Sequence, residues 1–108
     1  MEAGPIFHLA LAADWDRDPT APYATSTLGV SLAEQGFIHC SFRHQVGKIA
    51  DLVYRGREDV VVLEIDPALL GAPVKVEDLD DVGDAFPHIY GPLHRDAVVK
   101  VTALEDWR

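Results

Sequence analysis

Three short apolar segments of this 108-residue chain each carry one histidine, the side chain best suited to acid–base chemistry near neutral pH. The segments are Pro5–Ala10, Gly36–Ser41 and Phe86–Gly91. Their short length and their aromatic or β-branched residues favour strands over helices. A buried imidazole without a partner destabilises a protein. Three such histidines in so small a chain therefore predict a shared, partly enclosed site.

The second segment offers the best catalytic candidate, His39. His39 and Ser41 share one strand face, and Ser41 stands where the N-cap of a following helix belongs. The amides of that helix would then point toward His39, and helix N-termini favour phosphates and carboxylates. Arg43 could help to bind such an anion. The alternative is structural: His39 bonds a backbone carbonyl in the core, and Ser41 only caps the helix.

The third segment offers a second catalytic candidate, His88, on the same strand face as Tyr90. Pro87 and the Gly91-Pro92 turn restrict the backbone and so fix the directions of both side chains. Imidazole and phenol can exchange protons, bind hydroxyls or stack on a planar ring, so Tyr90 is predicted to bind a ligand. The alternative is a rigid edge strand. His8 is also predicted to bind the ligand, and this prediction is supported only by the presence of the other two histidines.

The rest of the chain supplies the elements that must position these residues. Val60–Ile65 is the strongest strand, and its apolar, β-branched run predicts a central place in a sheet. The other expected elements are a short helix or turn over 11–18, a helix capped by Thr25 or Ser26 and ended by Gly36, a helix from about Arg43 to Tyr54 with an apolar stripe, and strands over 72–77 and 97–104. This order predicts an α+β fold with a curved, mixed sheet and two or three helices.

Composition bounds the class of protein and its partners. With 108 residues, 48% of them hydrophobic, we expect a single domain over residues 1–108. The net charge of −9 disfavours nonspecific binding to nucleic acid or to anionic membranes. The chain shows no apolar run long enough to cross a bilayer and no export signal, and Cys40 is its single cysteine. We therefore expect a cytoplasmic protein, and the sequence carries no signal for its oligomeric state.

Other chemistries find less support in the sequence. It has no Gly-rich phosphate loop, paired-cysteine zinc motif or serine nucleophile elbow. Three histidines could form an open zinc site, but metal motifs show tighter local spacing, and no metal ligand is predicted. An acidic run is interpreted as a solvated loop, with a divalent cation site as the alternative; its members are Glu77, Asp78, Asp80, Asp81 and Asp84.

The segments Ile6–His8, Gly36–Ser41 and Phe86–Leu93 resemble a bacterial family called domain of unknown function 952, with a likeness from Ile6 to about Trp107. The resemblance implies a fold grouped with the ADP-ribosyltransferase superfamily, in which a split, strongly curved β structure encloses a cleft. A first-strand histidine there holds the ribose of NAD, a role that His8 would take. The glutamate that supports catalysis in that superfamily has no counterpart in the last motif.

Three functional hypotheses follow. The first is a binder or transferase of a nucleotide-like or phosphorylated small molecule in a histidine-lined cleft, with NAD or a related nucleotide as the cofactor that the resemblance implies. His39 or His88 would then act as acid or base. The second is a noncatalytic binding or structural module that contains a buried histidine network. The third is a metal-dependent hydrolase that uses the three histidines.

Overall fold

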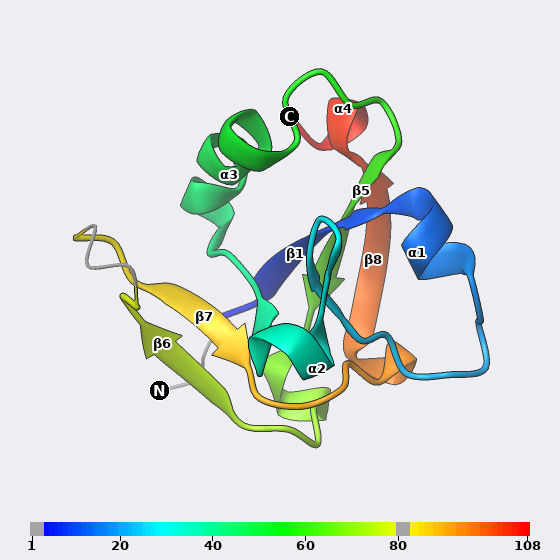
Figure 1. Ribbon diagram of the computed structural model, residues 1–108, viewed down its shortest axis with the longest axis vertical. Coiled ribbons are helices and arrows are strands. Elements are labelled where there is room, and N and C mark those ends of the chain that lie inside the picture. The colour runs from blue at the N-terminus through cyan, green and yellow to red at the C-terminus, as the bar shows by residue number, and fades with distance from the viewer. Residues whose placement is uncertain (1–3, 80–82) are drawn as a thin grey trace.

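The computed structural model describes residues 4–79 and 83–108, which form an arrangement of short strands and helices (Figure 1). The strands are β1 (Ile6–Leu11), β2 (Thr25–Thr27), β3 (Val30–Ser31), β4 (Ile38–His39), β5 (Val60–Ile65), β6 (Val74–Glu77), β7 (Phe86–Ile89) and β8 (Val98–Ala103). They pair as a sheet of order β1-β5-β8, a hairpin β2-β3 and a sheet of order β4-β7-β6.

The described residues contain four α-helices and three 3₁₀ helices, more than the two or three helices expected, and the last α-helix follows the last strand. The α-helices are α1 (Ala12–Asp16), α2 (Leu32–Gln35), α3 (Val46–Val53) and α4 (Leu104–Trp107), and the 3₁₀ helices are η1 (Arg43–Gln45), η2 (Pro67–Leu69) and η3 (Arg95–Ala97). Within the described ranges, no helix has the length and apolar character needed to cross a membrane.

The α+β class is confirmed, but the expectation of a mixed sheet is wrong. Every strand pair between described residues is antiparallel. A parallel pair needs a crossover connection that returns to the same sheet. The main helical connection, α3, leads instead from β4 in one sheet to β5 in the other, so it creates no parallel neighbours.

The prediction that β5 occupies a central position is confirmed, and the core explains its composition. β5 lies between β1 and β8, and both of its faces are covered. Leu63 and Ile65 belong to a core cluster with Ile38 and Ile89 of the other sheet. Val60 and Val62 belong to a second cluster beneath α3 and α4, so apolar residues are needed on both faces of the strand.

The helix expected to begin at Thr25 or Ser26 is wrong, because this stretch forms the β2–β3 hairpin. Its β-branched residues favour strands, and Gly29 takes the positive φ of 73° that the turn requires. The helix α2 begins later, where the hydroxyl of Ser31 accepts a hydrogen bond from the amide of Glu34. Gly36 ends that helix at a φ of 93°, as predicted.

The predicted N-cap at Ser41 is also wrong. The backbone of Ser41 pairs with Phe7, with N–O distances of 2.8 and 2.7 Å, so this residue continues the strand direction. The helical turn then starts at Arg43 as predicted, and the Gln45 side-chain oxygen accepts the amide hydrogen of Phe42 at 2.9 Å. This pairing fastens the chain after β4 to β1 and leaves α3 to pack over the first sheet.

Candidate functional site

The antiparallel register of β4 and β7 places two of the predicted histidines together. His39 lies directly opposite His88, and residues opposite one another in an antiparallel pair share a sheet face. Their ring centroids are 5.3 Å apart. The sequence separates these residues by nearly half the chain, so strand pairing alone creates the contact.

Phenylalanine rings enclose this histidine pair. The Phe37 ring stacks on His88 with a centroid distance of 4.1 Å, and the Phe86 ring lies 5.0 Å from that of His39. His88 is buried, with 3% of its surface exposed, whereas His39 is only partly covered. The rings therefore form a largely aromatic floor for the space above this sheet, with imidazole nitrogens at defined positions.

A cleft of about 510 Å³ opens over this floor, a volume suited to a small molecule. One wall is the sheet β4-β7-β6, and the opposite wall is α3, with the hairpin and α2 at one end. The lining residues are Ser26, Thr27, Gln35, Phe37, His39, Lys48, Ile49, Leu52, Val53, Glu77, Asp78, Leu79, Phe86 and His88. The predicted apolar stripe of α3 is thus divided, since Val46 and Ala50 enter the core whereas Ile49 and Val53 face the cleft.

A carboxylate that the sequence analysis did not assign to the site orients His88. Glu77 ends β6, and one of its oxygens lies 3.0 Å from Nδ1 of His88. The same oxygen accepts the hydroxyl hydrogen of Tyr90 at 2.5 Å. These hydrogen bonds, that of Tyr90 foremost, hold the pKa of Glu77 below its usual range. Glu77 is therefore an anion that can accept both hydrogens.

This arrangement fixes the state of the His88 ring. Because the carboxylate of Glu77 is an acceptor, Nδ1 of His88 carries the hydrogen. The side chain of His88 lines the cleft, and because its hydrogen bond to Glu77 uses Nδ1, Nε2 is the nitrogen left for a bound molecule. Such an Nε2 can take a proton from a bound molecule while the carboxylate stabilises the resulting imidazolium. The geometry is that of an oriented acid–base histidine.

Tyr90 and Arg43 do not line the cleft. Tyr90 supports Glu77 instead, and Lys75 lies over its ring with Nζ 4.9 Å from the centroid. The Arg43 guanidinium lies 4.8 Å from the centroid of the Phe7 ring, and Arg43 is absent from the cleft lining. Its side chain is 66% exposed and is 4.0 Å from Glu64. The structure thus places Tyr90 behind the site and Arg43 outside it.

His8 lies beneath the floor of the cleft, and both of its nitrogens are engaged. Nδ1 donates to the backbone carbonyl of His39 at 2.6 Å, so Nε2 accepts the hydroxyl hydrogen of Tyr23 at 2.9 Å. Burial lowers the pKa of His8 to about 4, which keeps the ring neutral. His8 and Ser41 line only a recess of about 10 Å³ next to the cleft, and both are buried. Here His8 holds the backbone of His39 in place.

Two features of the acidic run differ from the sequence interpretation. Glu77 belongs to the site, and Asp84 bonds the side chain of Gln45, whereas Asp80 and Asp81 lie outside the described residues. A usable signal was present: Val74–Glu77 and Phe86–Ile89 are two strand-like runs close in sequence, which favours a hairpin between them. Across residues 4–79 and 83–108, no three His, Cys, Asp or Glu side chains are placed to hold a metal ion.

Comparisons with known proteins found similar solved structures and one matching family model. The crystal structure of protein CC0527 from Caulobacter crescentus is similar, with a TM-score of 0.78 and 30% identity over 92% of this chain and 84% of that chain. Its solution NMR structure gives a TM-score of 0.70 and 33% identity over 93% and 84%. No curated protein matches the chain significantly. The family described as "Protein of unknown function (DUF952)" matches residues 10–101, and the chain therefore belongs to that family.

Proposed function

We propose that the protein binds a small ring-bearing molecule in the cleft and that His88 exchanges a proton with it. The observation that carries this proposal is the Glu77–His88 pair, in which a carboxylate fixes one ring nitrogen and leaves the other facing the cleft. General acid–base catalysis requires a positioned group of this kind. His39, beside His88, is the second polar group that such a molecule would meet.

The lining supports the ring of a nucleotide-like molecule more strongly than its phosphates. Phe86 and Phe37 offer aromatic surface, and Ile49 with Val53 offers apolar surface on the opposite wall. Lys48 is the one Lys or Arg in the described lining, and it lies 3.6 Å from Asp84. NAD or a related nucleotide, which the resemblance to the ADP-ribosyltransferase superfamily implies, would insert its base and leave its phosphates toward solvent.

The second candidate is a binding module without catalysis, and His8 favours it. His8 forms two hydrogen bonds, to the His39 carbonyl and to Tyr23. Its low pKa keeps the ring neutral, as expected for a histidine with a structural role in a buried network. In this version the cleft still takes a ligand, but His88 only donates to it or accepts from it. The two candidates differ in whether bound molecules turn over.

The test is an NMR titration of the protein with NAD, nicotinamide and ADP-ribose, followed through the side-chain resonances of His39 and His88. We expect a ligand with an inserted ring to shift both sets of resonances. At about 100 times its dissociation constant it should also add about 2.7 kcal/mol to the free energy of unfolding. Product analysis of the same samples then separates a catalytic site from a binding module.

The variants His88→Ala and His94→Ala provide the comparison. His94 is exposed and is absent from the cleft lining, so its replacement should leave binding unchanged. His88→Ala should weaken binding and abolish any turnover. If none of the three molecules shifts His39 or His88, the proposed ligand class is wrong. If turnover survives in His88→Ala, its acid–base role is wrong.

A further inference from the structure

The cleft gathers more negative than positive fixed charge, although it is largely apolar. Glu77 and Asp78 line it, and Asp84 lies at its mouth beside Lys48. Against these three carboxylates, Lys48 is the single Lys or Arg side chain in the described part of the lining. The carboxylates would therefore repel an anionic ligand in this cleft and attract a cationic one.

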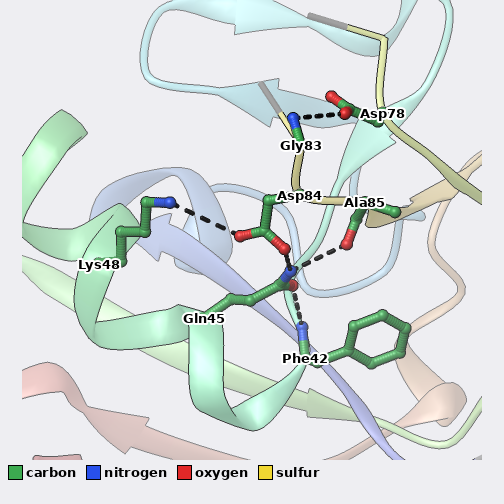
Figure 2. Close-up of polar contacts among 7 residues, drawn as sticks. All are labelled: Phe42, Gln45, Lys48, Asp78, Gly83, Asp84 and Ala85. Carbon is green, nitrogen blue, oxygen red and sulfur yellow. Dashed lines mark hydrogen bonds and ion pairs between the residues drawn. The ribbon is translucent and has the colours of Figure 1, made fainter. Parts of the chain in front are cut away.

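The hydrogen bonds around the mouth keep these acids in place, as Figure 2 shows. Gln45 is 2% exposed, and its amide nitrogen donates to Asp84 and to the carbonyl of Ala85, each at 2.9 Å. Asp84 thus has one oxygen fixed by Gln45 and the other 3.6 Å from Lys48. Its carboxylate neutralises the ammonium that would otherwise attract a phosphate.

Asp78 is also held by a hydrogen bond, from the residue that precedes Asp84. One of its oxygens accepts the backbone amide hydrogen of Gly83 at 2.7 Å, a contact also visible in Figure 2. Glu77 lies deeper, and its hydrogen bonds to Tyr90 and His88 favour the ionised carboxylate. The carboxylates of Glu77, Asp78 and Asp84 are therefore each held in place by different hydrogen-bond donors.

A second and independent feature points to a ligand in the same cleft. His88 is 3% exposed, its hydrogen bond to Glu77 uses Nδ1, and its ring lines the cleft, which leaves Nε2 as the nitrogen that a bound molecule can reach. The Phe37 ring stacks on His88 and the Phe86 ring lies against His39, and the faces of such rings attract organic cations through their quadrupoles. Apolar walls, aromatic rings and carboxylates together are the chemistry that recognises a positively charged nitrogen in an apolar frame.

We propose that the part of the ligand inside this cleft is an organic cation, such as a quaternary ammonium or an N-alkylated aromatic ring. The inference rests on the proposed function, because it concerns the same cleft, and it adds the charge of the ligand. The cation lies among Glu77, Asp78 and the aromatic rings, and anionic groups of the ligand stay outside.

The experiment compares three probes that share a benzyl or phenyl ring but differ in charge: benzyltrimethylammonium, benzyl alcohol and benzoate. Their dissociation constants are measured by NMR titration of the wild-type protein at low salt. We expect benzyltrimethylammonium to bind about tenfold more tightly than benzoate, with benzyl alcohol between them. The difference should shrink as sodium chloride is added, because salt screens partly exposed charges.

Matched variants locate the effect. Asp78→Asn and Glu77→Gln should each reduce the preference for the cation, whereas Asp106→Asn, which removes an exposed acid on α4, should not. Glu77→Gln also perturbs His88, so Asp78→Asn is the variant that isolates charge.

Two results would overturn the proposal. One is benzoate binding as tightly as the ammonium probe, and the other is that none of the three probes shifts the amides of the cleft. Neither result decides the acid–base role of His88, which the nucleotide titration and His88→Ala test separately.

Discussion

Lowering the pH from neutral toward 4 should destabilise this protein through one buried side chain, His8. In the folded state its ring is enclosed by the His39 carbonyl and the Tyr23 hydroxyl, and burial lowers its pKa from 6.5 to about 4. In the unfolded chain the imidazole titrates near its ordinary value. Between about pH 4 and 6.5, His8 is therefore mostly protonated in the unfolded chain and mostly neutral in the folded protein.

The magnitude follows from that difference. Stability rises with pH wherever the unfolded state binds more protons, so the His8 contribution is complete above about pH 6.5 and is lost progressively down to about pH 4. At about 1.4 kcal/mol for each pH unit, the loss is about 3 kcal/mol. That is a large share of the stability of a small domain.

The assay is urea unfolding of the wild type and of His8→Asn at several pH values between 4 and 7. The asparagine amide can still donate toward the His39 carbonyl but does not titrate. The variant should be less stable at neutral pH and should lose about 3 kcal/mol less than the wild type on acidification. His94→Asn, at an exposed position, serves as the control.

A direct measurement guards against a variant that fails to fold. In the wild-type protein, the His8 ring resonances should stay those of a neutral imidazole from pH 7 down to 5. Protonation of His8 above pH 6 in the folded protein would refute the reasoning. So would an equal loss of stability in the wild type and His8→Asn.

Two further predictions concern single side chains. In Tyr90→Phe the pKa of Glu77 should rise toward its usual value, because the Tyr90 hydroxyl is the main cause of the depression; carboxyl NMR titration measures it, and an unchanged pKa would contradict the assignment. Cys40 is buried and its thiol pKa is raised, so a thiol reagent should modify it only in denaturant, and rapid reaction in buffer would show that the site is open.

Local pattern was enough to predict most strands, and it failed where tertiary pairing decides. The runs at 6–11, 60–65 and 98–103 are strands, as their apolar and β-branched residues predict. The hairpin from Thr25 to Ser31 was missed because its hydroxyl residues also suit helix caps. Ser26 in fact uses its hydroxyl to accept the amide hydrogen of His39 at 3.3 Å.

The site could be predicted in part. Alternation within a strand identifies which side chains share a face, but it does not say which face meets the core. For this reason the sequence did not distinguish His8, which lies beneath the floor, from His39 and His88, which line the cleft. Glu77 was overlooked because its role depends on the pairing of β6 with β7, and a carboxylate in an acidic run is usually solvated.

The strand orders β1-β5-β8 and β4-β7-β6 interleave along the chain, so no single cut of the backbone separates one sheet from the other. The strands of one sheet are separated in the sequence by strands of the other, so neither sheet can form from one continuous stretch of chain. The protein should therefore unfold cooperatively as one unit, and the cleft should not persist in any fragment. Its long-range pairings also predict slower folding than a helical bundle of this length would show.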